Sequence, residues 1–284
     1  MMRIILENPF VSRSRKNKAN VGKIVLPPVM SEPNAWFYEY SVSKVMLFGN
    51  PSMCTDYLVL AIYAAPNCLA IFKSWSPSKK WIYLEDVCGK DANLVDKCFM
   101  DANYYKGKIY LVNALTGIHE IDAFSNKNGD LHINHVFKWQ QPYRSRMYIA
   151  ESSKGDLLLV KRLDDEDEDH EFNPVTLGFN VYKLNENKMV QVDNLDGDSI
   201  FVGDGQTVCV AACDLENCQP NSIYFTDDAF MFHALNHSHV RETRFGPRDS
   251  GIFCLDDNTI KPLYPYHLPS HKDLPPPIWV LPMF

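Results

Sequence analysis

Short apolar segments separated by turn residues recur along the whole chain, and this spacing constrains the fold more than any other feature. Most segments are about four to eight residues long and are bounded by Gly, Asn, Asp or Pro, as is typical of strands. Almost no amphipathic stretch is long enough for a mid-sized helix. The sequence therefore predicts an all-β protein. The expected strands cover residues 3–7, 23–26, 44–48, 57–64, 68–73, 81–85, 98–103, 108–113, 118–123, 131–137, 147–151, 156–161, 178–184, 189–192, 199–203, 207–212, 222–226, 251–255 and 259–264.

A weak internal repeat favours a β-propeller over a sandwich or a barrel. The repeated pattern is a turn with Gly or Asn, then a strand of alternating apolar residues, then a second strand that ends near an aromatic residue. It begins at Asn67, Lys106, Lys154 and, more loosely, Gly205. These starts lie roughly 40–50 residues apart, close to the length of a four-stranded propeller blade. The number of strands then predicts about five four-stranded blades, with six as the alternative, in a single β-propeller domain over residues 1–284.

Closure of a propeller ring usually joins the two ends of the chain in one blade. Each small sheet buries both faces against its neighbours, so no blade is stable alone and the ring must close. We therefore expect residues 3–7 to pair near the last strands, at residues 259–264 or 279–281.

Composition and apolar run lengths exclude a membrane span. Hydrophobic residues make up 46% and charged residues 22% of the chain, which is ordinary for a globular protein. The longest apolar run, Tyr57–Ala65, is far shorter than the roughly 20 residues of a transmembrane helix. The start of the chain has no signal-peptide core or transit pattern. We expect an intracellular protein of the cytoplasm or nucleus, with no membrane partner.

The net charge of −7 is concentrated in one segment. Residues 164–169, DDEDED, supply six of these charges, so the remainder is nearly neutral and no basic face predicts nucleic-acid binding. Six like charges in sequence repel one another, which indicates a solvated loop. A calcium site or a basic partner is the alternative, although the spacing and glycine of an EF-hand are absent.

Eight cysteines in a large chain without a secretion signal are expected to be free thiols. Cys209 and Cys213 would lie about 13 Å apart on one face of a strand, too far for a disulfide or shared zinc. A helical turn at this place would instead bring them together with Cys218, and that alternative stays open.

Three histidines have the densest metal-like spacing in the chain: His233, His237 and His239 in FHALNHSH. These histidines could bind zinc, but no carboxylate or cysteine lies beside them at the spacing of a further zinc ligand. A solvated connection is the alternative, and we predict no metal and no cofactor.

Asp227 and Asp228 directly follow an expected strand, where paired carboxylates could act as acid and base. Aspartate at a strand end also accepts backbone N–H groups and shapes the turn, and we favour that role. Neither a Gly-x-Ser-x-Gly elbow nor a complete phosphate-binding glycine loop is present, because Gly203 and Gly205 lack a third glycine and a following helix. The sequence predicts no catalytic residue.

Two further groups of residues allow both a structural and a binding interpretation. The basic stretch Arg13–Lys18 is expected to be a solvated hairpin loop, with a nuclear-import or phosphate-binding tract as the alternative. The five tryptophans are expected to pack between blades, although one exposed on a face could anchor a partner.

Several motifs in order along the chain carry a resemblance to a known family. They are ENPF (7–10), KIVLPP (23–28), YKGKIYLVN (105–113), GDLLLVKR (155–162), GFNVYKLNENKMVQV (178–192), SIFVGDG (199–205), CQPNSIYFTDD (218–228) and PPPIWVLP (275–282). The chain resembles a plant family of F-box-associated β-propeller proteins, kelch-like in architecture, whose C-terminal domain is of unknown function. The resemblance implies structural roles for Asn8, Pro9, Asn221, Tyr224, Thr226, Asp227 and Asp228.

The resemblance also implies a propeller that presents a binding surface. Many members carry an N-terminal F-box that docks onto a Skp–cullin ubiquitin ligase. Only six residues precede the first motif here, so we expect no F-box domain and no Skp-type ligase subunit as partner.

Two hypotheses for function follow. The first is a non-catalytic, monomeric propeller that binds an unknown protein ligand, like the substrate-binding part of F-box ubiquitin-ligase adaptors. It predicts an exposed apolar or aromatic patch. The alternative is a propeller enzyme with a metal or carboxylate site at the ring axis. It predicts titratable residues from several blades converging with shifted pKa values.

Overall fold

The computed structural model describes residues 3–7, 23–29, 42–51, 53–63, 67–84, 98–122, 131, 133–141, 145–165, 175–185, 188–226, 228, 249–263 and 279. These residues form nineteen β-strands and the short 3₁₀ helix η3 (Ala212–Asp214). Each expected strand overlaps an observed one, so the all-β prediction is confirmed. In the described residues no helix has both the length and the apolar character needed to cross a membrane.

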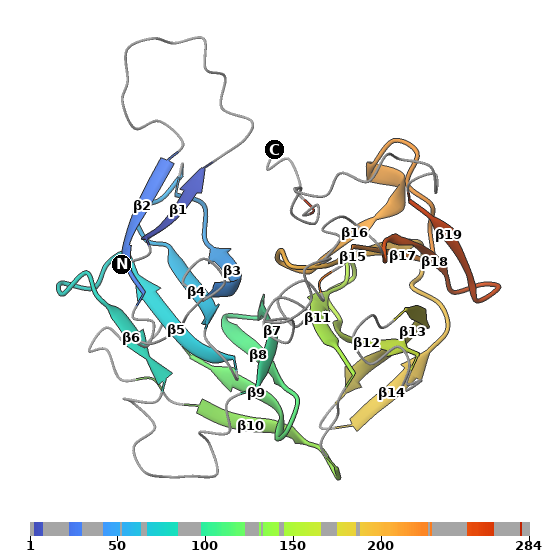
Figure 1. Ribbon diagram of the computed structural model, residues 1–284, viewed down its shortest axis with the longest axis horizontal. Coiled ribbons are helices and arrows are strands. Elements are labelled where there is room, and N and C mark those ends of the chain that lie inside the picture. Colours follow the sequence, from blue (N-terminus) through green and yellow to red (C-terminus); the bar gives the residue numbers. More distant parts are fainter. Residues whose placement is uncertain are drawn as a thin grey trace, which may run out of the picture. The chain divides into compact units, whose positions relative to one another are not determined.

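The chain divides into two compact units, which are described separately. Unit 1 comprises residues 1–97, 127–130 and 280–284, and unit 2 comprises residues 98–126 and 131–279. Figure 1 labels the strands of both units.

Unit 1 contains a two-stranded and a four-stranded antiparallel sheet. The first pairs β1 (Arg3–Glu7) with β2 (Lys23–Pro28). The second has the order β3 (Val42–Phe48), β4 (Leu58–Tyr63), β5 (Cys68–Lys73) and β6 (Trp81–Tyr83).

The core of unit 1 lies between these two sheets. Every residue of β4 and β5 is buried, which agrees with their unbroken apolar sequences LVLAIY and CLAIFK. Alternation in β1 and β2 sends Ile4 and Leu26 into the same cluster, while their neighbours Ile5 and Val25 stay about half exposed. The two-stranded sheet is therefore anchored by one apolar face.

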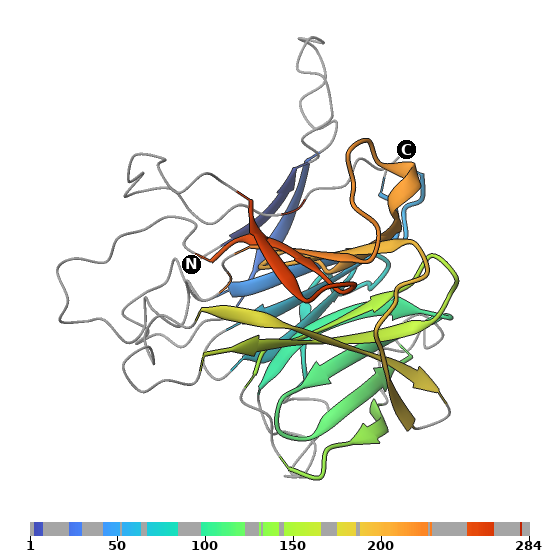
Figure 2. The same cartoon turned by 90° about the vertical axis from the view of Figure 1, so that its right-hand side faces the viewer.

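Unit 2 contains three larger sheets (Figures 1 and 2). The first has the order β10 (Ile133–Lys138), β9 (Gly117–Ile121), β8 (Lys108–Asn113), β7 (Phe99–Tyr105). The second has the order β11 (Met147–Glu151), β12 (Leu157–Asp164), β13 (Thr176–Asn185), β14 (Lys188–Val192). The third has the order β16 (Val208–Ala211), β15 (Asp198–Val202), β17 (Ser222–Phe225), β18 (Gly251–Cys254), β19 (Thr259–Pro262).

The third sheet departs from the simple up-and-down order of the other two. Strand β15 pairs in parallel with β17, while β16 folds back antiparallel on the other side of β15. The chain returns through η3 to begin β17 at Ser222. Figure 2 shows the red β18–β19 hairpin continuing from the orange strands of this sheet.

One glycine is required by close packing of the first sheet of unit 2. Gly117 has φ +127°, and a Cβ there would lie 1.9 Å from the carbonyl oxygen of Phe137. Only glycine combines this backbone conformation with so close an approach of two strands. It fixes the start of β9 against the end of β10, where Gly117 pairs with Lys138.

The fold class is confirmed, but two finer predictions are wrong for the described residues. Four sheets contain four or more strands, which gives four complete blades rather than five or six. Dividing the number of strands by four gave too many blades because the strands are shared unequally. Strands β1 and β2 form a two-stranded sheet, and another sheet contains five strands.

The expected pairing of residues 3–7 with residues 259–264 is also wrong for the described residues, whereas the alternative pairing with residues 279–281 stays a prediction. Strand β1 pairs with β2, and β19 pairs with β18. Both pairings join strands close together in sequence, which keeps the entropic cost of closing the connection low. Trp279 lies in no strand, and residues 280–281 lie outside the described residues.

Candidate functional site

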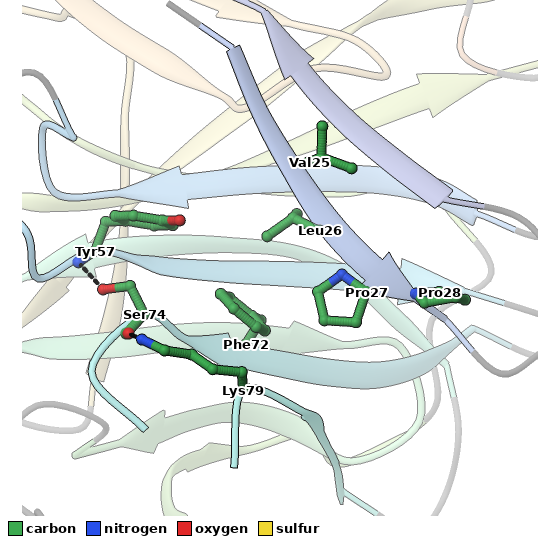
Figure 3. A pocket seen from close by; sticks show the side chains of 8 residues that line it. All are labelled: Val25, Leu26, Pro27, Pro28, Tyr57, Phe72, Ser74 and Lys79. Carbon is green, nitrogen blue, oxygen red and sulfur yellow. Dashed lines mark hydrogen bonds between the residues drawn. The ribbon is translucent and has the colours of Figure 1, made fainter. Parts of the chain in front are cut away.

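An open groove in unit 1 has the geometry of a binding site. Its volume is about 440 Å³. It lies between the end of β2, the start of β4 and the segment that joins β5 to β6 (Figure 3). The lining residues are Val25, Leu26, Pro27, Pro28, Tyr57, Phe72, Ser74 and Lys79.

Strand β2 forms one wall because of its alternating pattern and its two terminal prolines. Leu26 is buried beneath the wall, whereas Val25 is 53% exposed at its rim. Proline has no backbone N–H and is found mainly on edge strands or at strand ends. Pro27 and Pro28 therefore end the strand and leave a rigid apolar surface.

Aromatic rings form the floor of the groove. The ring centroids of Tyr57 and Phe72 are 6.5 Å apart, and those of Phe72 and Trp81 are 5.7 Å apart. The Trp81 indole N–H donates to the carbonyl oxygen of Pro27 at 2.8 Å. This bond ties the end of β2 to β6 and holds the wall against the floor.

Polar groups are held at one end of the groove by Ser74. Its hydroxyl accepts a bond from the Tyr57 backbone N–H at 2.8 Å and donates to the Thr55 carbonyl at 2.7 Å. The Lys79 ammonium donates to the Ser74 carbonyl, as Figure 3 shows. Burial raises the pKa of the Tyr57 phenol, so its hydroxyl stays protonated at neutral pH. The groove thus combines an apolar body with a cationic end.

The charge of residues 1–97, which include the residues of the groove, differs from that of the rest of the chain. Residues 1–97 carry twelve Lys or Arg against eight Asp or Glu, whereas residues 98–284 carry sixteen against 27. Among the described side chains of unit 1, the only carboxylate is Asp56. The lysines there are Lys23, Lys44, Lys73, Lys79 and Lys80, of which Lys23, Lys79 and Lys80 are exposed.

The densest cluster of charges lies in unit 2 around Arg162 of β12. Its guanidinium donates to Asp228 at 2.7 Å and to Asp249 at 2.6 Å. Asp228 follows β17 and Asp249 precedes β18, so one arginine joins two sheets. Arg146 also pairs with Asp228, and the Tyr148 hydroxyl donates to the same carboxylate at 2.5 Å.

Further contacts complete the environment of this arginine. Its Nε donates to the Thr176 hydroxyl at 2.6 Å and lies 3.3 Å from the Asp164 carboxylate. The guanidinium lies 5.9 Å from the ring centre of Phe179 and 5.2 Å from that of Phe225. Aromatic faces at this distance stabilise a desolvated cation.

The pKa shifts in this cluster indicate a structural role. Burial lowers the pKa of Arg162, but Tyr148 and Asp249 raise it more, so the side chain stays charged. Burial raises the pKa of Asp164, and Arg162 partly offsets this change. Asp228 and Asp249 are each engaged by an arginine, so neither is placed as a free acid or base.

A second polar network joins the inner strands of unit 2. The Asp101 carboxylate on β7 accepts the Ile149 backbone N–H at 3.0 Å and the Thr207 hydroxyl at 2.5 Å. The Asn103 amide donates to the carbonyls of Ile149 and Thr207 at 3.1 and 3.3 Å. Both side chains are buried, and all four bonds are internal. Polar groups from several strands converge here, but Asp101 is the one titratable side chain among the four residues of this network.

A pair of histidines occupies β9 and β10. The His119 and His135 rings are 4.0 Å apart, and His119 Nε2 lies 2.7 Å from the Thr116 hydroxyl oxygen. Burial, with a smaller contribution from His135, lowers the pKa of His119 to about 4. His119 is therefore neutral at physiological pH.

Several of the residues singled out in the sequence lie outside the part of the chain that the structure describes. The histidines His233, His237 and His239 lie outside the described residues, as do Asn8, Pro9, Asp227 and the basic stretch at residues 13–18. Among the described residues, no group of three or more His, Cys, Asp or Glu could hold a metal. The seven described cysteines are free thiols, as expected.

Asn221 and Tyr224, implied as structural by the resemblance, make specific bonds. Asn221 has φ +52°, and its side chain accepts the Leu195 N–H at 2.9 Å and donates to Asp256 at 3.0 Å. The Tyr224 hydroxyl accepts the Gln219 N–H at 2.8 Å.

Thr226, the next of these residues, closely approaches a glycine. A Cβ on Gly203 would lie 2.2 Å from the Thr226 hydroxyl oxygen. A side chain at position 203 would therefore require the Thr226 hydroxyl to move.

Comparison with known proteins identifies the family. The model of the KIB1-4 β-propeller family matches residues 2–254. The chain belongs to this family. No curated protein and no solved structure matches the chain. The match covers most of the residues of both units, and it agrees with the four-stranded blades that the structure shows.

Sequence reasoning missed both the groove and the arginine of this KIB1-4 propeller. Arg162 ends the motif GDLLLVKR next to Lys161, and the local pattern does not mark it as buried. Two of its acidic partners, Asp228 and Asp249, are 66 and 87 residues away, so spacing could not reveal them. The groove depends on three segments that are separated in the sequence, and only PP at residues 27–28 signalled a strand end there.

Proposed function

We propose that this chain is a non-catalytic protein-interaction propeller and that the groove of unit 1 is where its protein ligand binds. The groove carries the proposal because its lining combines apolar and aromatic residues with the polar groups of Ser74 and Lys79. Surfaces of this composition are enriched at protein interfaces. The half-exposed pair Ile5 and Val25, directly opposite one another on β1 and β2, adds apolar area next to it.

The charge clusters of unit 2 support the same choice over an enzyme. A general acid or base must reach a substrate with a pKa near the working pH. The carboxylates around Arg162 are engaged by arginines, a tyrosine or a threonine, and Asp101 is fully buried. These networks hold blades together, which leaves the apolar groove as the better candidate for binding.

The resemblance to F-box-associated propellers supports a finer proposal. In that interpretation the chain corresponds to the substrate-receiving part of a ubiquitin-ligase adaptor in the cytoplasm or nucleus of a plant cell. The ligand is then a protein marked for ubiquitination.

A pair of surface variants tests the proposal in cells. Val25→Asp places a charge at the rim of the groove, whereas Leu177→Asp places one at a 61% exposed apolar position of β13 in unit 2. The full chain and both variants are purified by affinity tag, and co-purifying proteins are quantified by mass spectrometry. We expect a set of proteins that Val25→Asp loses and Leu177→Asp keeps.

Two results would count against parts of the proposal. If both variants keep the same partners as the unaltered chain, the groove is not the binding site. Recovery of Skp-type subunits with the full chain would show that the expected absence of these partners is wrong. Circular dichroism and urea unfolding of each variant check that its fold is intact.

A further inference from the structure

The groove of unit 1 has a chemistry that specifies its ligand. We propose that it binds a segment of a partner protein in which a large apolar side chain lies beside a carboxylate. The apolar side chain packs on Phe72, Tyr57 and Pro27, and the carboxylate pairs with the Lys79 ammonium. This inference rests on the proposed function and adds the class of partner sequence.

The apolar part follows from the size and composition of the groove. A volume of about 440 Å³ is in the range of small-ligand pockets. It therefore accommodates a large side chain and adjoining backbone. In Figure 3 the Leu26 side chain points toward the Tyr57 ring, and Phe72 lies below it. Rigid aromatic and proline surfaces lose little conformational entropy when a ligand packs on them.

The backbone of β2 argues for recognition through side chains at this point. Pro27 and Pro28 have no N–H group to donate to an added strand. The Pro27 carbonyl already accepts the Trp81 indole N–H. A peptide laid along this end of β2 therefore cannot extend the sheet ladder by the usual alternating bonds, and its side chains must supply the contacts.

The acidic part of the ligand follows from the charged side chains of unit 1. Lys79 is exposed yet directed to the groove by its bond to the Ser74 carbonyl. An ammonium has three donor hydrogens, so one bond leaves it able to pair with a ligand carboxylate. Lys80 and Lys23 are exposed in the same unit, and the carboxylate of Asp56 accepts a bond from the Thr55 hydroxyl. Charge complementarity therefore selects an acidic partner over a basic one.

Three pools of synthetic peptides test the inference directly. Each fluorescein-labelled nine-residue peptide has a central Leu, Phe or Trp in a Gly/Ser background. The flanking residues are Glu in one pool, Gln in the second and Lys in the third. Binding to the full chain is measured by fluorescence anisotropy at low salt. We expect the Glu pool to bind most tightly and the Lys pool most weakly.

Charge reversal at the lysine provides the decisive variant. Lys79→Glu should reverse the order of the pools, so that the Lys pool binds more tightly than the Glu pool. Lys79→Arg should keep the original order because it keeps the charge. Lys188→Glu, at an exposed position of β14 in unit 2, is the matched control and should change nothing. A gain of binding by Lys79→Glu cannot result from misfolding.

The outcomes separate this inference from the proposed function. Equal binding of the three pools, no binding of any pool, or an unchanged order with Lys79→Glu would each overturn the inference. If Val25→Asp still loses its cellular partners in that case, the groove binds protein but does not recognise a carboxylate of the partner. If Val25→Asp loses no partner either, the proposed function fails as well.

Discussion

The two units of the molecule use their charged side chains in different ways. In unit 2, Arg162 is 1% exposed and binds two aspartates from a neighbouring sheet. In unit 1, the core cluster is apolar and aromatic, and three lysines are exposed at the surface. Buried ion pairs of the first kind hold a structure together, whereas exposed cations beside an apolar groove are free to meet a ligand. In our proposal, the buried charges stabilise unit 2, and the exposed lysine at the groove of unit 1 takes part in recognition.

The largest expected effect is the loss of the arginine in unit 2. Arg162→Ala leaves the carboxylates of Asp228 and Asp249 without this buried partner. Removing one member of a buried ion pair costs about 3–5 kcal/mol. We expect the free energy of unfolding, measured in urea, to fall by this amount.

Lys188→Ala is the control for that measurement, since an exposed substitution changes stability by about 0.5 kcal/mol or less. A loss below 1 kcal/mol for Arg162→Ala would mean that the ionic network does not stabilise unit 2, and the contrast between the units would fail.

The second prediction concerns pH and the buried histidine of unit 2. The pKa of His119 is about 4 in the folded chain, against 6.5 for an unperturbed histidine. Between these values the unfolded chain binds a proton that the folded chain does not bind. The free energy of unfolding therefore falls as pH decreases from 6.5 toward 4, by about 2–3 kcal/mol from this residue.

Comparison with His119→Gln isolates this contribution from that of carboxylates such as Asp164, whose pKa is raised by burial. The variant should lose less stability on acidification than the unaltered chain. Parallel curves of stability against pH would show that the histidine does not contribute.

The third prediction compares equivalent tryptophans of the two units. Trp81 donates to the Pro27 carbonyl in unit 1, and Trp139 donates to the Asn113 carbonyl at 2.7 Å in unit 2. Replacing either by Phe removes one hydrogen bond and should cost about 1 kcal/mol in urea unfolding.

Peptide binding then distinguishes the two substitutions. Only Trp81→Phe should weaken binding of the Glu peptide pool, because only that bond holds the wall of the groove. Equal effects of both substitutions on binding would contradict the placement of the site in unit 1.

The smallest expected effect on stability is at the cationic end of the groove. Lys79→Gln changes an exposed side chain, so the free energy of unfolding should change by about 0.5 kcal/mol or less. An exposed ion pair contributes about 0.2–1 kcal/mol, so affinity for the Glu pool should fall by up to about fivefold. The effect should diminish as salt concentration increases. If the free energy of unfolding falls by more than the free energy of peptide binding, Lys79 stabilises the fold instead of binding the ligand.

The strand positions were predicted well because they depend on two local features of the sequence, the alternation of apolar residues and the position of turn residues. Residues 3–7 and 68–73 were placed with the observed bounds of β1 and β5. For the described residues, the predicted pairing of β1 with residues 259–264 and the predicted number of blades were wrong. A strand pattern does not encode its partner, and the repeat signal cannot tell a two-stranded sheet from a complete blade.

The candidate site was less predictable than the fold. Asp228 was noted in the sequence as a strand-end residue, but its pairing with Arg146 and Arg162 depends on contacts 82 and 66 residues apart. The groove requires the end of β2 to lie beside residues 57–79, which no local pattern reveals.

The sequence by itself determined the all-β class, most strand positions, the free thiols and the absence of familiar catalytic motifs. Those features depend on residues adjacent in the chain, where alternation and turn chemistry act directly. Only the tertiary structure decided which strands pair, which charges are buried together and where a groove stays open beside a lysine. Such choices arise from contacts between distant segments, whose free energy depends on three-dimensional packing and not on local pattern.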